Sequence, residues 1–229
     1  MSRKRELLEE LARRKRAADR AGGVIERIRA ELFDKQIALL DDPARNKAAL
    51  CTRRAGKTST WSRYAVIECL RRPGALVRIW AQARLRAKEL LWNEIRDVCA
   101  RHGIKVDTHE TELRVTFENR SEIRLVGADK DKEAQKKRGD KTSLEIVLES
   151  QSFGPFLQKL VEDVIEPSLF DTRGTVCMEG TPGPVCAGYW FAVTGTEEDL
   201  KRWTSSGREV KDGDSVHIVG ANWSCHRWS

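Results

Sequence analysis

The segment from Thr52 to Ser59 constrains the fold most strongly, because it joins a short apolar run to a segment with helical spacing. It reads Thr-Arg-Arg-Ala-Gly-Lys-Thr-Ser, follows the apolar residues 48–51 and precedes a helical pattern over residues 61–70. A strand, a tight loop that ends in Gly-Lys-Thr and a helix form the context of a phosphate-binding loop. The N–H groups at such a helix start bind phosphate oxygens, and the helix dipole favours their negative charge.

The individual residues of this loop have predicted roles. Lys57 is expected to contact the β- and γ-phosphates of a nucleotide, and the hydroxyl of Thr58 is expected to bind Mg²⁺. Cys51 stands where the common form of the motif has its first glycine. A polar turn that contains Gly-Lys-Thr by chance is the alternative. The predicted nucleotide-binding residues of the loop are Thr52, Arg53, Arg54, Ala55, Gly56, Lys57, Thr58 and Ser59.

Composition restricts the class of protein. A chain of 229 residues, 40% hydrophobic and 34% charged, is typical of a soluble α/β domain, and it holds no apolar run long enough to span a membrane. The six cysteines are scattered without a C-x-x-C pair, so they indicate reduced thiols in a cytoplasm rather than zinc ligands or disulfides. The net charge of +7 gives weak support to a polyanionic partner.

The N-terminal region predicts a charged helical arm. Residues 2–21 place leucines and alanine at helical spacing among Arg, Lys and Glu, and Gly22-Gly23 is expected to end this helix before a second one over residues 24–33. The arm either packs a narrow apolar stripe on the domain or contacts a neighbouring subunit or DNA. The apolar positions of the stripe are Leu7, Leu8, Leu11 and Ala12.

The rest of the chain alternates strands and helices, which indicates a mostly parallel sheet covered by helices. Glu149 follows a buried strand directly, and the carboxyl end of such a strand is where a nucleotide hydrolase places its catalytic base. The strands are predicted over 75–81, 113–117, 122–126, 144–148, 175–179 and 215–219, the second and third as a hairpin, and the helices over 85–102 and 157–165.

Four segments, in this order, resemble the ATPase domain of phage large terminase subunits, the motors that package viral DNA. Arg53-Arg54-Ala55-Gly56-Lys57-Thr58 resembles the family's variant phosphate loop. Residues 146–153 resemble its hydrophobic strand followed by Asp-Glu-Ala-Gln-Ser-Phe, and Gly180-Thr181-Pro182 resembles its coupling motif. Phe33 and Gln36 stand where its adenine-binding residues would be.

The resemblance implies an α/β P-loop NTPase of the additional-strand, catalytic-glutamate type, with a mostly parallel central sheet flanked by helices. It divides the chain into an N-terminal helical arm, 1–31, and an ATPase domain, 32–229, without the nuclease domain that usually follows. The implied function is coupling of ATP hydrolysis to translocation of double-stranded DNA into a capsid, with ATP and Mg²⁺ as cofactors. The implied partners are the portal protein, the small terminase subunit and further copies in a ring, in the cytoplasm of the infected bacterial host and without a membrane.

The resemblance also implies roles in phosphoryl transfer to water. Glu149 would orient or deprotonate the water. Arg53 or Arg54 would offset charge developing on the γ-phosphate, and Arg138 is a candidate for the same task across a subunit boundary. Gly180-Thr181-Pro182 would report the nucleotide state to a DNA-gripping surface.

One departure from the family pattern concerns the metal. Leu148 stands where the family has its Walker B aspartate, and leucine cannot ligate Mg²⁺. Thr58 and the phosphates could hold the ion alone, Glu149 or Glu145 could compensate, or hydrolysis could be impaired. Two alternatives to the motor stay open. The first is a helicase-like DNA-dependent ATPase, which needs a second motor domain. The second, suggested by Leu148, is a nucleotide- or DNA-binding module with impaired hydrolysis.

Overall fold

The structure is a computed structural model that describes residues 3–128, 134, 137–182, 188–195 and 223–229. Its described residues form one eight-stranded sheet in the order β3-β4-β5-β2-β6-β7-β1-β8. The strands are β1 (Asn46–Cys51), β2 (Leu76–Ala81), β3 (Val106–His109), β4 (Arg114–Phe117), β5 (Glu122–Gly127), β6 (Leu144–Val147), β7 (Thr175–Gly180) and β8 (Ser224–Trp228).

The sheet confirms the predicted fold class. Strands β5, β2, β6, β7, β1 and β8 run parallel, and β4 pairs antiparallel with both β3 and β5. β7 lies between β1, which leads into the phosphate loop, and β6, which leads to Glu149. This inserted strand is the additional strand that the fold class requires.

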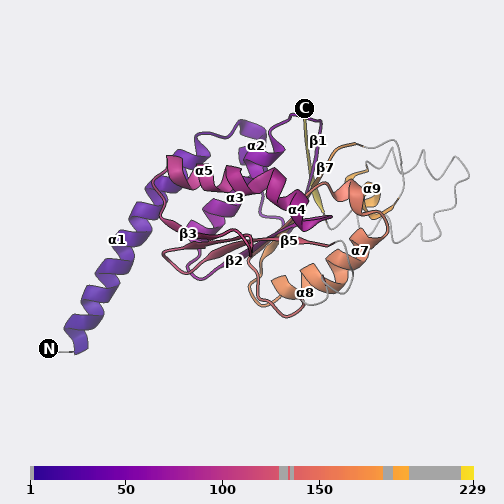
Figure 1. Ribbon diagram of the computed structural model, residues 1–229. Coiled ribbons are helices and arrows are strands. Elements are labelled where there is room, and N and C mark those ends of the chain that lie inside the picture. Colours follow the sequence, from indigo (N-terminus) through magenta and orange to yellow (C-terminus); the bar gives the residue numbers. More distant parts are fainter. Residues whose placement is uncertain (1–2, 129–133, 135–136, 183–187, 196–222) are drawn as a thin grey trace, which may run out of the picture.

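Helices cover both faces of the sheet (Figure 1). One face carries α1 (Arg3–Arg29), α2 (Asp34–Asp41), α3 (Lys57–Arg71), α4 (Arg84–Ala87) and α5 (Asn93–Arg101). The other face carries α7 (Phe156–Leu160), α8 (Glu166–Leu169) and α9 (Gly188–Thr194). Within the described part of the chain, no helix combines the length and the apolar character that crossing a bilayer would require.

Strand β2 shows why the sheet has two cores. Successive side chains of a strand point to opposite faces, so Val77 and Ile79 join the apolar cluster under α3 while Trp80 joins the cluster under α7 and α8. Arg78 points to the second face as well, and its guanidinium is fully buried against Glu145 of β6. Both faces are covered, so the strands read as nearly continuous apolar runs in the sequence.

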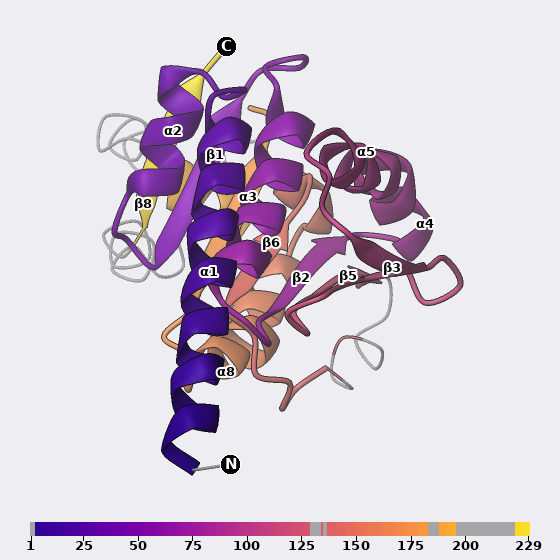
Figure 2. The same cartoon turned by 90° about the vertical axis from the view of Figure 1, so that its left-hand side faces the viewer.

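The arm differs from its prediction. Gly22 and Gly23 do not end a helix, because α1 continues through them to Arg29. Ile25 and Ile28 pack in the core beside α3, and this packing outweighs the cost of about 1 kcal/mol that each glycine adds inside a helix. Leu7 and Leu11 are exposed instead of packed on the domain, and Figures 1 and 2 show the first half of α1 extending away from the sheet.

The remaining predicted elements can be compared with the structure one by one. The hairpin of β4 and β5 is confirmed, and the predicted helix over 85–102 is present as α4 and α5 joined by a π-helical turn, Lys88–Trp92. β3 and β8 were not predicted. The strand predicted over 215–219 lies outside the described residues.

Candidate nucleotide-binding site

The phosphate loop leaves β1 at Cys51 and enters α3 at Lys57. Arg54 and Gly56 adopt left-handed conformations with φ of 64° and 75°, which turn the chain sharply between strand and helix. No described side chain caps α3, a helix of 15 residues, so its first N–H groups remain free to bind an anion. The local geometry is therefore that of a phosphate-binding helix start.

The ammonium group of Lys57 lies inside this loop. It donates to the carbonyl oxygen of Thr52 at 2.8 Å and reaches the hydroxyl of Thr181 at 3.4 Å. Lys57 thus links the phosphate loop to the predicted coupling motif. Thr58 is exposed in the first turn of α3 beside the half-buried Ser59.

The loop arginines point to solvent. Arg53 and Arg54 are both exposed, and neither forms an ion pair or side-chain hydrogen bond with another residue that the structure describes. Ala55 is buried beneath them. The two guanidinium groups are consequently available to a bound polyanion.

Gln36 is hydrogen-bonded to the end of the phosphate loop and the first turn of α3. Its side chain is 2% exposed, and its amide nitrogen donates to the Gly56 carbonyl at 3.1 Å and to the Thr60 hydroxyl at 2.8 Å. Its amide oxygen accepts the Phe33 N–H at 3.2 Å. Gln36 is therefore adjacent to the loop as predicted, with its amide donors occupied by the chain itself, and contact with adenine stays a prediction.

Phe33 and Trp228 flank the same loop. The Phe33 ring is partly exposed and packs edge-on against Trp228, with ring centroids 6.2 Å apart. The Trp228 indole N–H donates to the Ala55 carbonyl at 2.7 Å, and its own carbonyl accepts the Thr52 N–H at 3.3 Å. Sequence reasoning missed Trp228 because its segment, 223–229, has no recognisable strand pattern.

Glu149 stands at the carboxyl end of β6, as predicted, in a left-handed conformation with φ of 50°. Both of its carboxylate oxygens are held by Arg86, at 2.8 Å from Nη2 and 3.0 Å from Nε. This pairing lowers the pKa of Glu149, burial opposes the effect, and the charge of Lys57 adds to it. The pairing with Arg86 thus favours the ionised carboxylate.

Arg86 was not predicted. It lies on α4, which follows β2, and β2 is the neighbour of β6 in the sheet. The carboxyl ends of parallel strands meet at one edge, so the residues after β2 and after β6 become neighbours. A basic residue shortly after a buried strand was the available signal, and such residues are common on surface helices.

The predicted coupling motif connects two parts of the site. Besides the Lys57 contact, the Thr181 N–H donates to the side-chain oxygen of Gln151 at 3.2 Å, two residues after Glu149. A Cβ on Gly180 would lie 2.4 Å from that oxygen and 2.7 Å from the Trp190 ring, so only glycine permits this approach. Pro182 is exposed.

Glu179 is a second carboxylate that sequence reasoning missed. It is 4% exposed, and its Oε1 accepts the backbone N–H of Glu149 at 2.9 Å. Its Oε2 is buried without a hydrogen-bond partner among the described residues. Burial raises the pKa of Glu179 to about 7, although the Glu149 N–H and the Lys57 charge act against that rise. The only signal was an acid in an otherwise apolar strand.

The structure rules out one of the two carboxylates considered as substitutes at the Leu148 position, Glu145. Leu148 is 2% exposed and packs in the apolar cluster beneath α3. Glu145 points to the other face of the sheet, where it is paired with Arg78. Compensation by Glu145 is therefore wrong, because strand alternation turns its side chain away from the phosphate loop.

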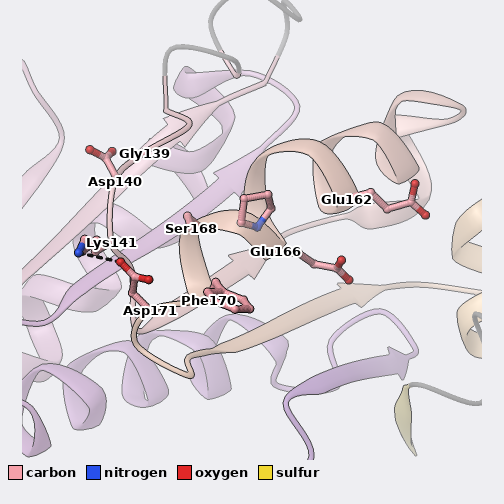
Figure 3. Close-up of a pocket in the computed structure, with 9 residues that line it drawn as sticks. Gly139, Asp140, Lys141, Glu162, Glu166, Ser168, Phe170 and Asp171 are labelled. Carbon is pink, nitrogen blue, oxygen red and sulfur yellow. Dashed lines mark ion pairs between the residues drawn. The ribbon is translucent and has the colours of Figure 1, made fainter.

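Arg138 is not brought to the phosphate loop within this chain. It donates to the carbonyl of Asp163 at 2.6 Å and lies 3.7 Å from that residue's carboxylate. The nearby residues 139–141 line a cleft of about 520 Å³ before the start of β6, the sheet edge opposite the phosphate loop. Figure 3 shows the acidic side chains Glu162 and Glu166 in this cleft and the ion pair of Lys141 with Asp171.

Solved structures with a similar fold include several phage packaging proteins. The large terminase ATPase domain of Thermus phage P74-26 matches with a TM-score of 0.62 and 19% identity over 86% of this chain and 80% of that one. The chain has the fold of a large terminase ATPase domain. The D6E large terminase in complex with ADP (TM-score 0.59, 15% identity) and the HK97 large terminase (0.58, 14%) match over the same 86%.

The match covers 46% of the D6E chain and 39% of the HK97 chain, so this chain spans less than half the length of those two terminases. No protein-family model matches the sequence, and no curated protein does. At identities of 14–19% the likeness establishes the fold, and the chemistry of the site is argued from its own residues.

Proposed function

We propose that this chain is the ATPase motor domain of a DNA-packaging terminase, which couples ATP hydrolysis to translocation of double-stranded DNA. The observation that carries the proposal is the meeting of Lys57, Glu149 and Thr181 at the carboxyl edge of a sheet with the terminase ATPase fold. Nucleotide hydrolysis needs a phosphate-binding lysine and an ionised carboxylate. Its coupling to movement needs a third loop, here the one with Thr181, that contacts this site.

The residues present fit a nucleotide and Mg²⁺. The free N–H groups of α3 and the ammonium of Lys57 would hold the phosphates, and the exposed face of Phe33 would stack on the base. Thr58 would hold Mg²⁺, and the ion would supply positive charge against the charge that develops on the phosphates. The D6E terminase binds ADP and ATP-γ-S in crystals, which supports the same ligand class here.

Catalysis by these residues requires a rearrangement of Glu149. Both of its oxygens are bonded to Arg86, so one of these bonds must open before Glu149 can accept a proton from water. Arg53 or Arg54 would stabilise the charge on the γ-phosphate from within the chain, and Arg138 would do so only from a neighbouring copy. Thr181 would carry the change at Lys57 and Gln151 to the rest of the molecule.

The partners of the motor follow from the same proposal. The net charge of +7 and the exposed arginines suit double-stranded DNA. We also propose that the chain forms a homo-oligomeric ring and binds the portal protein and the small terminase subunit. It would do so in the cytoplasm of an infected bacterium. One structure with a similar fold is described as the phi-28 gp11 DNA packaging motor.

Phosphate release from ATP and Mg²⁺, with and without duplex DNA, tests the proposal. Wild type should turn over ATP, and Lys57→Ala and Glu149→Gln should each lose at least about 100-fold of that rate, the scale of a lost catalytic group. Lys159→Ala, on helix α7 of the opposite face, is a matched control that should retain it. Unchanged turnover in Lys57→Ala would contradict the proposal.

Leu148 favours one second candidate, a nucleotide- or DNA-binding module that does not hydrolyse. Its side chain is buried among apolar residues and offers no oxygen to a metal. Tight ATP binding without phosphate release, converted to turnover by Leu148→Asp, would select this candidate over the motor.

A further inference from the structure

The chain lacks a carboxylate at Leu148 but carries one at the same height on the next strand. β6 and β7 pair in register up to Val147 and Met178, and Leu148 and Glu179 are the next residues of the two segments. On its other side Glu179 is the partner of Ala49 in β1, two residues before the phosphate loop. Glu179 therefore stands between Leu148 and the strand that carries the loop.

Glu179 also shares a face with Leu148. Cys177, two residues earlier in β7, packs in the apolar cluster beneath α3, and strand alternation places Glu179 on that same face. Leu148 packs in the same cluster. The side chain of Glu179 reaches the Glu149 N–H, so it extends toward the edge where Lys57 lies.

The second oxygen of Glu179 is left unsatisfied by the described part of the chain. Its Oε2 is buried and accepts no hydrogen bond from any described residue, whereas Oε1 is occupied by the Glu149 N–H. A buried oxygen without a hydrogen bond is costly, and a bound ion or water is one explanation for such a group in a native protein. A cation in the nucleotide site would supply the missing interaction.

We propose that Glu179 provides the carboxylate that supports Mg²⁺ in this chain, taking over from β7 the task that Leu148 cannot perform on β6. Mg²⁺ keeps several of its waters when bound, so Glu179 can act on the ion through one of them. The same side chain holds the Glu149 backbone, which links metal support to the position of the base. This inference rests on the proposed nucleotide site.

The test measures the affinity of the 229-residue chain for ATP-γ-S in Mg²⁺ and in EDTA, by calorimetry. Wild type should bind more tightly in Mg²⁺. Glu179→Gln, which keeps the size of the side chain and an oxygen for the Glu149 N–H, should lose about 10- to 100-fold of that Mg²⁺-dependent gain, as loss of an outer metal partner does. Binding in EDTA should change little.

Two further variants make the result specific. Glu149→Gln should keep the Mg²⁺-dependent gain, and Leu148→Asp combined with Glu179→Gln should recover it, because a carboxylate returns on the adjacent strand. Circular dichroism melting shows whether each variant is folded. A wild-type gain in folded Glu179→Gln would overturn the inference alone, and absence of ATP-γ-S binding by wild type would overturn the proposed function together with it.

Discussion

Two buried glutamates on neighbouring strands have opposite surroundings. Glu145 of β6 is fully buried, and its two oxygens accept hydrogen bonds from four side chains. Glu179 of β7 is nearly as buried, yet among the described residues it accepts one hydrogen bond, from a backbone N–H. The donors to Glu145 are Arg78, Trp80, Thr142 and Ser168.

The difference separates structure from function in this fold. Glu145 neutralises Arg78 on the face covered by α7 and α8, and side-chain donors occupy both of its oxygens. Glu179 lies at the edge where the phosphate loop and Glu149 meet, with one oxygen unused. A satisfied buried network stabilises one conformation, whereas an unsatisfied carboxylate oxygen beside a nucleotide site can accept a bound ion.

The largest expected effect on stability comes from breaking the buried ion pair of Glu145 with Arg78. Glu145→Gln removes the fully buried carboxylate of the Arg78 ion pair and leaves the guanidinium with the partly exposed Asp140, and we expect the free energy of unfolding to fall by about 3–5 kcal/mol. Glu179→Gln at pH 7 should not lower the free energy of unfolding, because no buried charge loses its partner. Urea unfolding of both variants measures the two values, and equal losses would refute the contrast.

The next largest effect is the pH dependence of stability that Glu179 causes. Its folded-state pKa of about 7 lies above the value of 4.5 that it has in an unfolded chain, so its stabilising contribution is complete below pH 4.5 and is lost as the pH rises through 7. Without nucleotide and metal, the stability of wild type relative to Glu179→Gln should fall by about 3 kcal/mol across this range. A difference that does not vary with pH would contradict the assignment.

A smaller effect tests the glycine that follows Glu179. Gly180→Ala places a methyl group 2.4 Å from the Gln151 oxygen and 2.7 Å from the Trp190 ring, and we expect a loss of about 1–3 kcal/mol in unfolding free energy. Gly22→Ala is the matched control, since nothing lies within 4 Å of its added carbon in α1. That control should gain up to about 1 kcal/mol, because alanine is favoured inside helices.

The smallest effect on stability concerns the exposed ion pair of Glu149. Arg86→Ala should cost less than about 1 kcal/mol, since both side chains are partly solvated. The pKa of Glu149 should rise once Arg86 no longer lowers it, and the acid limb of the pH–turnover profile should move to higher pH. An acid limb that stays in place would show that Glu149 is not the titrating base.

Much of the site could be predicted because its signals are local. The order strand, Gly-Lys-Thr loop and helix is legible within about 25 residues, and Glu149 follows directly on an apolar run. The four motifs of the resemblance add the adenine-side segment at Phe33 and Gln36 and the coupling segment at Thr181, and the structure brings both to the loop. Their roles in binding and catalysis stay predictions.

Other features needed packing between distant segments. Arg86 contacts Glu149 because β2 and β6 are neighbours in the sheet. Trp228 contacts Ala55 because β8 pairs with β1, although the two residues are 173 positions apart in the sequence. α1 continues through Gly22 because Ile25 and Ile28 bury against the domain. No local propensity carries this information.

The sequence alone determined the parallel α/β architecture, the phosphate loop and the position of Glu149, since periodicity and turn chemistry act over a few residues. Only the tertiary structure decided which carboxylates face that loop. Strand order places β7 beside both β1 and β6, and the two-residue alternation turns Glu179 toward the site and Glu145 away from it. Register between strands far apart in the chain decides this, because a shift by one residue would exchange the two faces.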